Sequence, residues 1–108
     1  MRIFGLKTCD TCRKAIKALR EAGHDPEVID VRADGLSEAD RTAILEAFGA
    51  EAINKSSTTW RTLSEAEKTA DAADLLVAHP TLMKRPVIEA EGQLYLGWKA
   101  DVQAALLG

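Results

Sequence analysis

The chain has 108 residues and a formal net charge of −3, with 46% hydrophobic and 29% charged residues. This length and composition are typical of one globular domain, here residues 1–108, and exclude a second domain with its own core. The acidic balance disfavours direct, nonspecific binding to nucleic acid, and no apolar run approaches the length of about 20 residues that a membrane helix needs. We therefore expect neither nucleic acid nor a membrane as a direct partner.

A polar turn that holds both cysteines follows the first predicted strand. Residues 1–6 are apolar enough for a strand, and residues 12–22 place apolar side chains at the i, i+3, i+4, i+7 spacing of a helix face. Cys9 should therefore lie at or just before a helix N-terminus, where free backbone N–H groups and the helix dipole favour a thiolate. Cys12, one helical turn later, should face the buried side and stay close enough to Cys9 to form a disulfide.

Cys9 is the candidate nucleophile of this pair. Lys7 and Arg13 flank it, and cations and helix N-termini lower the pKa of a thiol from its usual ~8.5, whereas the neighbouring Asp10 acts in the opposite direction. Inert core cysteines remain an alternative. A cysteine pair with this spacing between a strand and a helix favours thiol redox chemistry.

Half of a zinc site is a second alternative to redox chemistry. Structural zinc normally takes four ligands, and besides the cysteines the chain offers only His24 and His79, which are not at paired ligand spacing. We therefore expect no metal site. His24 is most simply a residue of a surface turn, and His79, beside Pro80, is most simply a residue at a helix C-terminus.

The start of the chain bears on the compartment. Residues 1–5 enter a strand directly, which predicts that no signal peptide is present and that the protein is cytoplasmic. In a reducing compartment a pair of nearby cysteines works as a dithiol that cycles and seldom as a permanent crosslink.

The next segments complete a β-α-β unit and then turn helical. Residues 22–26 carry the signals of a helix end and a turn, and residues 27–31 read as a second strand, which a right-handed crossover makes parallel to the first. A capping pattern at Ser37 predicts a helix that ends at Gly49. Residues 63–79 predict one or two further short helices.

Residues 54–59 form an entirely polar stretch between these helices. A surface loop explains them. The alternative is a loop folded over the cysteine turn, which would offer hydroxyl groups, the Asn54 amide and Lys55 to an anionic substrate.

The last third of the chain changes from helical to strand periodicity. Residues 86–90 and 93–96 are short apolar runs joined by Glu91-Gly92, the length of a tight hairpin turn, and residues 100–107 predict a final helix. The order β-α-β, helices, β-β-α predicts an α/β thioredoxin-like fold with a mixed four-stranded sheet and a helical insertion. In such sheets ligands bind beyond the carboxyl ends of the parallel strands, where the cysteine turn begins.

Arg85 and Pro86 precede the third predicted strand. Proline at this position cannot donate an N–H group and is a candidate for a cis bond, although simple strand punctuation would also explain it. The thioredoxin-like order favours the cis form, because that fold sets a cis-proline opposite its active cysteine. Arg85 would then face the thiol, where a guanidinium group can hold an oxyanion or stabilise the thiolate.

Several separated motifs together resemble the arsenate reductase-like (ArsC/Spx/YffB) family along essentially the whole chain. The segments around residues 58–61 and 84–86 are most similar to the YffB-like branch, whereas the second cysteine resembles the Spx redox regulators. The motifs are Cys9-Asp10-Thr11-Cys12-Arg13-Lys14-Ala15, Asn54 with Thr58-Thr59-Trp60-Arg61, His79-Pro80, Lys84-Arg85-Pro86 and Leu96-Gly97-Trp98.

The resemblance implies a thioredoxin fold with a helical insertion and a reactive cysteine at Cys9. In the glutathione- and glutaredoxin-coupled arsenate reductases of this family, three arginines surround the oxyanion. Arg85 matches one of them, whereas Asn54 and Gly97 stand at the other two positions. This departure removes much of the oxyanion clamp and leaves the thiol chemistry intact.

Two functions follow as hypotheses. In the first, the protein is a monomeric cytosolic thiol reductase without a bound cofactor, and glutathione, glutaredoxin or thioredoxin is its reductant. Its substrate is a disulfide, a glutathionylated thiol or arsenate. Cys9, Cys12 and Arg85 are the expected catalytic residues, and the expected substrate-binding residues are Thr8, Asp10, Thr11, Arg13, Asn54, Lys55 and Pro86. In the second hypothesis, the protein is a Spx-type regulator that binds RNA polymerase under the control of a Cys9–Cys12 redox switch.

Overall fold

The structure is a computed structural model, and it describes residues 1–107. Contacts between residues divide the chain into two compact units. One unit contains Met1–Asp34 and the chain from Arg85 onward, and the other is Gly35–Lys84. The assignment of residues 1–108 to a single domain stays a prediction.

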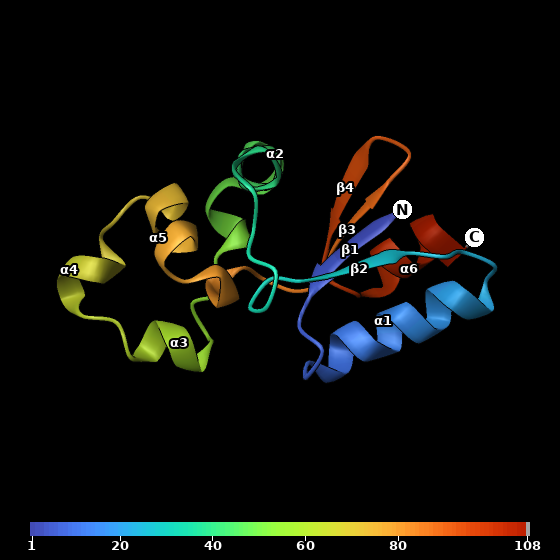
Figure 1. Ribbon diagram of the computed structural model, residues 1–108, viewed down its shortest axis with the longest axis horizontal. Helices are drawn as coiled ribbons and strands as arrows, with labels where there is room; N and C mark the ends of the chain where they lie inside the picture. The colour runs from blue at the N-terminus through green and yellow to red at the C-terminus, as the bar shows by residue number, and fades with distance from the viewer. Residues whose placement is uncertain (108) are drawn as a thin grey trace. The chain divides into compact units, whose positions relative to one another are not determined.

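A four-stranded mixed sheet forms the centre of the first unit (Figure 1). The strands lie in the order β2-β1-β3-β4; β1 is parallel to β2 and antiparallel to β3, and β3 and β4 form an antiparallel hairpin. Their bounds are Arg2–Gly5 for β1, Glu27–Asp30 for β2, Val87–Ala90 for β3 and Gln93–Leu96 for β4. The predicted thioredoxin-like α/β fold with a mixed four-stranded sheet is confirmed.

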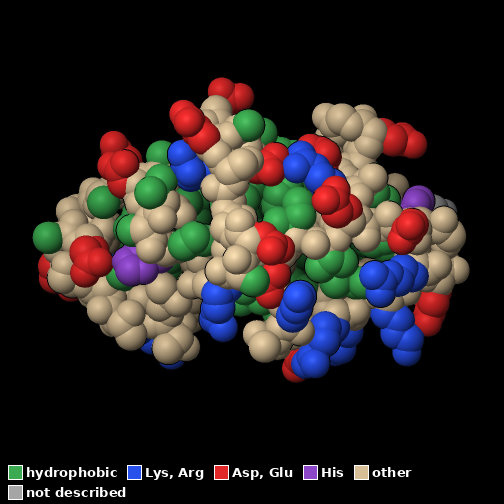
Figure 2. All heavy atoms as spheres, in the orientation of Figure 1, with side chains coloured by type: hydrophobic (Ala, Val, Ile, Leu, Met, Phe, Trp, Pro, Cys, Tyr) green, Lys and Arg blue, Asp and Glu red, His purple; other side chains and the backbone are tan. Residues whose placement is uncertain are grey.

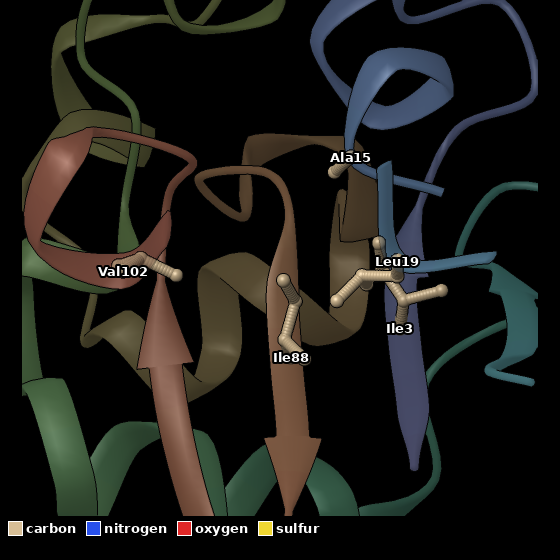
Figure 3. Close-up of a cluster of buried hydrophobic side chains, with 5 residues drawn as sticks. All are labelled: Ile3, Ala15, Leu19, Ile88 and Val102. Atoms are coloured by element: carbon tan, nitrogen blue, oxygen red, sulfur yellow. The ribbon is translucent and has the colours of Figure 1, made fainter. Parts of the chain in front are cut away.

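Two helices, α1 (Asp10–Glu21) and α6 (Ala100–Leu107), pack against one face of this sheet. The buried side chains of α1 recur at helical spacing, at Cys12, Ala15 and Leu19, because one stripe of the helix must leave water. Figure 3 shows the cluster in which the two helices meet the sheet. Its buried members are Ile3, Ala15, Leu19, Ile88 and Val102.

The hairpin turn between β3 and β4 agrees with the sequence. Glu91 and Gly92 have φ angles of 51° and 79°, the left-handed conformation that a two-residue hairpin turn requires. Trp98, which follows β4, is partly buried and packs against the core cluster. The strand ends differ from the predicted ends by one residue: β1 is Arg2–Gly5, β2 stops at Asp30 and β3 begins at Val87.

The second unit consists of short helices, and sequence reasoning missed three of them, at residues 49–52, 58–61 and 80–82. The predicted polar loop over residues 54–59 ends at Ser57, because a helix, α3, begins at Thr58. The Ser57 hydroxyl starts that helix by accepting a hydrogen bond from the Trp60 N–H group at 3.1 Å. The elements are α2 (Glu38–Phe48), η1 (Gly49–Ala52), α3 (Thr58–Arg61), α4 (Glu65–Lys68), α5 (Ala72–Ala78) and η2 (Pro80–Leu82).

The predicted helix starts in this unit are confirmed where a serine begins them. Ser37 accepts a hydrogen bond from the Asp40 N–H group, and Ser64 forms a reciprocal capping box with Glu67. His79 is the C-cap residue that follows α5, which agrees with the position at a helix C-terminus that Pro80 predicts. None of the helices within residues 1–107 combines the length and the hydrophobicity needed to cross a bilayer.

A buried carboxylate ties the turn after β1 to the end of β2. Asp30 is 8% exposed, and its Oδ2 atom accepts a hydrogen bond from the Lys7 N–H group at 3.2 Å. Its Oδ1 atom accepts from the N–H groups of Arg32 and Ala33 at 2.9 and 3.0 Å. The hydrogen bond from Ala33, followed by that from Lys7, holds the pKa of Asp30 below its ordinary value of 3.8. The carboxylate therefore fixes where the chain leaves β1.

We expect Asp30→Asn to lower the free energy of unfolding by about 1–3 kcal/mol at neutral pH, because the amide cannot accept all three N–H groups. The pKa of Asp30 in the folded protein is lower than its ordinary value of 3.8. The stabilisation of the fold by this carboxylate is therefore fully present above pH 3.8, and it is lost as the pH falls through the pKa of the folded protein. The difference between wild type and Asp30→Asn should therefore shrink below pH 3.8.

Denaturant unfolding across this pH range tests the prediction. The matched control is Asp25→Asn, which changes an exposed carboxylate in the turn before β2 and should alter stability much less. A difference between wild type and Asp30→Asn that stays constant as the pH falls would mean that the charge of Asp30 is not what stabilises the turn.

Candidate active site

Cys9 lies where the sequence predicts it, at the N-terminus of α1. It is the N-cap residue, in an extended conformation with φ −85° and ψ 119°. Its N–H group donates to the Leu6 carbonyl at 3.1 Å, and its carbonyl accepts from the Arg13 N–H group at 3.0 Å, which closes the turn after β1 and starts the helix. The side chain is partly exposed. A substrate can therefore reach the Cys9 sulfur.

The surroundings of Cys9 favour its thiolate. Burial raises the pKa of the Cys9 thiol, but hydrogen bonds from the N–H group and the thiol of Cys12, together with the Arg85 guanidinium, outweigh that effect, so the pKa lies below its ordinary value of 9.0. A lowered pKa raises the fraction of thiolate near neutral pH, and the thiolate is the nucleophilic form. Cys9 thus has the exposure and the charge of a nucleophile.

Cys12 has the opposite properties. It is 1% exposed, and burial together with the neighbouring Cys9 raises the pKa of its thiol to about 12. Gly5 in β1 allows the Cys12 sulfur to lie this deep, because a Cβ atom on Gly5 would stand 2.6 Å from it. The protonated Cys12 thiol can donate a hydrogen bond to the Cys9 sulfur. Cys12 therefore supports Cys9 from beneath the turn.

Arg85 and Pro86 approach this turn from a distant part of the chain. The Arg85-Pro86 peptide bond is cis, which confirms the prediction. Pro86 is fully buried, and its carbonyl accepts a hydrogen bond from the Gly97 N–H group at 2.8 Å, so the β3 and β4 ends hold it in place. Arg85 lowers the pKa of the Cys9 thiol through a side-chain hydrogen bond and through its charge. That Arg85 is a catalytic residue stays a prediction.

The cations that flank Cys9 in sequence differ from those that act on it. The sequence predicts that Lys7 and Arg13 lower the pKa of Cys9; the cation that does so is Arg85. Arg13 instead forms an ion pair with Asp10 on the exposed surface of the first helical turn. This pair offsets the charge of Asp10, which sequence reasoning expects to oppose the thiolate.

The remaining expected site residues fall into two groups. Thr8 and Thr11 are exposed on either side of Cys9, in the same unit. Asn54 and Lys55 belong to the second unit, where the Asn54 side chain accepts a hydrogen bond from the Ser56 N–H group at 3.0 Å. The Lys55 Nζ atom lies 5.6 Å from the centre of the Trp60 ring. That Asn54 and Lys55 join Cys9 at one site stays a prediction.

The histidines are engaged elsewhere in the structure. The His24 Nε2 atom lies 3.1 Å from the Leu106 carbonyl oxygen, and the His79 Nε2 atom lies 3.4 Å from a carboxylate oxygen of Glu67. Within residues 1–107, no group of three or more His, Cys, Asp or Glu side chains lies close enough together to hold a metal ion.

Sequence reasoning missed two residues that position the site, Gly5 and Asp30. A glycine inside an apolar strand is a signal of close approach by another group, which here is the Cys12 sulfur. An aspartate at the end of an apolar strand is a weaker signal, because most such residues point into water. Neither signal identifies the partner without the fold.

Comparison with known proteins finds a family and several relatives that match nearly the whole chain. The model of the ArsC family matches residues 4–106. An uncharacterized protein of Haemophilus influenzae is 38% identical over 109 residues, which cover 95% of this chain and 96% of that protein. A solved structure named YFFB is 34% identical, with a TM-score of 0.90, over 99% of this chain and 98% of its own. An arsenate reductase (ArsC) related protein of Brucella melitensis is also 34% identical, with a TM-score of 0.72, over 95% and 91%.

We expect Arg85→Gln to raise the pKa of the Cys9 thiol, because the variant removes the positive charge beside the thiolate. The rate of Cys9 alkylation by iodoacetamide as a function of pH, with the modified cysteine identified by mass spectrometry, measures that pKa. Lys14→Gln is the matched control, since it removes an exposed cation from α1 that does not act on Cys9. Equal shifts in the two variants would show that net charge, and not the position of Arg85, sets the pKa.

Proposed function

The chain belongs to the ArsC family, and from this premise we propose that it is a thiol oxidoreductase whose Cys9 thiolate attacks a disulfide or a glutathione mixed disulfide. The resemblance that the motifs indicate is thereby confirmed at the level of the family. The observation that carries the proposal is the contrast between the two thiols: the pKa of Cys9 is lowered and that of Cys12 is raised to about 12. Cys9 is therefore the stronger candidate nucleophile of the two, and Cys12 is the weaker one.

The family match and the name of one relative support thiol-based reduction. One structure that is 34% identical is called an arsenate reductase (ArsC) related protein, and the other bears the name YFFB. The match of the family model extends from residue 4 to residue 106, so it includes Cys9, Cys12 and Arg85. The reaction class is therefore supported along the whole chain, whereas the substrate depends on the residues around Cys9.

In the first step, the Cys9 thiolate attacks one sulfur of the substrate disulfide, which in a glutathione mixed disulfide is the glutathione sulfur. A bond forms between the Cys9 sulfur and that atom, the substrate S–S bond breaks, and the second substrate sulfur leaves as a thiolate that takes a proton from water. Arg85 lies beside the Cys9 sulfur and stabilises the negative charge before attack. The product is a mixed disulfide on Cys9.

An external thiol completes the cycle in this proposal. Burial is the largest cause that raises the pKa of Cys12, and it persists when Cys9 is in a disulfide and has lost its charge. Cys12 therefore stays a poor attacking thiol. Glutathione, delivered free or through glutaredoxin, attacks the mixed disulfide, releases the Cys9 thiolate and becomes oxidised to a disulfide. This chemistry suits a reducing compartment such as the cytoplasm.

A disulfide suits the site better than arsenate does. Of the three positions at which the arsenate reductases of the family carry arginine, only Arg85 is arginine here. Gly97 has a φ angle of 85°, a conformation that residues with a side chain rarely adopt, so its backbone is shaped for glycine. With one guanidinium in place of three, the site has little to hold a dianionic oxyanion, whereas a disulfide needs only the nucleophile.

Turnover with glutathione tests the function, with a glutathionylated model disulfide and arsenate as alternative substrates. We expect wild type to reduce the disulfide faster than arsenate, and Cys9→Ser to lose at least about 100-fold in rate because the nucleophile is gone. Cys12→Ser, the matched control within the same turn, should keep most of its turnover because the external thiol resolves the intermediate.

Two outcomes would contradict this account. Full turnover by Cys9→Ser would place the reactive group elsewhere. No turnover on either substrate, with a Cys9–Cys12 disulfide that still forms reversibly, would favour the redox-switched regulator of RNA polymerase over the enzyme.

A further inference from the structure

A hollow of about 540 Å³ lies along α1, within the first unit, and the chemistry of Cys9 does not account for it. Four of its lining residues are cationic, namely Lys7, Arg13, Lys17 and Arg20, and two are aliphatic, Ile16 and Val28. The volume lies within the range of about 300–1,000 Å³ that is typical of ligand sites. The lining includes Lys7, which precedes the nucleophile by two residues in the sequence, but not Cys9 itself.

The cations of this hollow follow the geometry of the helix. Arg13, Lys17 and Arg20 are spaced i, i+4, i+7, and with Ile16 they form a stripe beside the one that packs into the core. The stripe is about 10 Å long, since each helical residue rises 1.5 Å. Lys and Arg side chains gather over α1, at the lower right of Figure 2.

The local charge is opposite to that of the whole protein. The chain has a net charge of −3, yet the hollow has four cations and one acidic residue, Glu21, in its lining. The positive charge of Arg13 is partly offset by its ion pair with Asp10. Lys17 and Arg20 are exposed and continue the stripe away from that pair. The charge of the hollow is thus complementary to an anionic partner, which the rest of an acidic surface would not attract.

The uncharged part of the lining indicates which anionic partner fits. Ile16 and Val28 are aliphatic and partly buried, and Ile16 also packs against the core cluster, so the apolar floor is fixed. The lining includes no aromatic side chain, and single-stranded nucleic acid relies on aromatic rings to stack its bases. An aliphatic floor with a cationic rim matches a polypeptide segment that alternates leucine-like and acidic side chains.

We propose that this hollow docks an acidic segment of the protein substrate whose disulfide or glutathione mixed disulfide Cys9 reduces. An aliphatic side chain of the segment rests on Ile16 and Val28, and its carboxylates lie against Lys17 and Arg20. The assignment of the segment to a substrate rests on the function proposed above. Docking along α1 brings the disulfide of the segment to the N-terminal end of the helix. The exchange at Cys9 is the step already described, in which the sulfur of the segment leaves as a thiolate and glutathione is the reductant.

A fluorescein-labelled Glu-Leu-Glu-Glu-Ser-Gly peptide tests whether the hollow binds an acidic segment. Its Kd is measured by fluorescence anisotropy, and no thiol exchange takes place because the peptide has serine in place of cysteine. Lys17→Gln/Arg20→Gln should raise the Kd by about 3- to 10-fold, since it removes two charge contacts of modest strength each. A peptide with Gln in place of every Glu should bind more weakly to wild type, as should a peptide with Ser in place of Leu. Added salt should weaken the binding of the acidic peptide.

The matched control is Lys14→Gln/Lys99→Gln, which removes the same net charge from two exposed positions outside the hollow. It should leave the Kd of the acidic peptide nearly unchanged. Equal weakening in the two double variants would overturn the proposal, because net charge alone would then explain binding. Equally tight binding of citrate or of a single-stranded oligonucleotide through Lys17 and Arg20 would overturn it too. Thermal unfolding of each variant checks that the fold is intact.

A second measurement links the surface to the reaction. The same peptides, with a cysteine in place of the serine and glutathione attached through a disulfide, serve as substrates. The ratio of kcat/KM for the acidic peptide to that for the Gln peptide should exceed one in wild type and fall in Lys17→Gln/Arg20→Gln. A ratio of one in wild type, with both peptides reduced by Cys9, would overturn the docking proposal and leave the proposed function standing. Binding through Lys17 and Arg20 without reduction of either peptide would instead overturn the proposed function.

Discussion

The contact between the Cys12 sulfur and the backbone of Gly5 is the constraint on which the rest of the site depends. A Cβ atom at Gly5 would stand 2.6 Å from that sulfur, so only a glycine in β1 lets α1 begin so close to the sheet. The same contact buries Cys12 and raises the pKa of its thiol to about 12. Burial of one cysteine thus leaves a protonated hydrogen-bond donor directly beneath the other.

The turn between β1 and α1 is held from three directions. Asp30 binds the Lys7 N–H group from the end of β2, Cys12 supports the Cys9 sulfur from the first turn of α1, and Arg85 reaches it from the segment before β3. Asp30 ends β2 and Arg85 lies just before β3, and these two strands flank β1 in the sheet order β2-β1-β3. The fold therefore brings groups that are up to 76 positions apart in the sequence, from Cys9 to Arg85, to one sulfur atom.

The sequence predicted the parts of this site that depend on local pattern. Helical periodicity and the polar turn placed Cys9 at the N-terminus of α1 and turned Cys12 inward, and the order of elements suggested the cis bond at Pro86. The sequence did not predict the contacts that depend on tertiary structure. Neighbours in sequence pointed to Lys7 and Arg13 as the cations that act on Cys9, whereas Arg13 is occupied by Asp10 and Arg85 takes the role. The start of α3 was missed because a single serine cap, Ser57, is a weak signal within a polar run.

The unequal states of the two thiols are the centre of this account, and the direct measurement is an NMR titration of both cysteines, labelled with ¹³C at Cβ, in the reduced wild-type protein. The account predicts that Cys9 titrates below 9.0 and that Cys12 stays protonated until the pH approaches about 12. Titration of Cys9 at or above 9.0, or of Cys12 before Cys9, would contradict the assignment of Cys9 as the nucleophile.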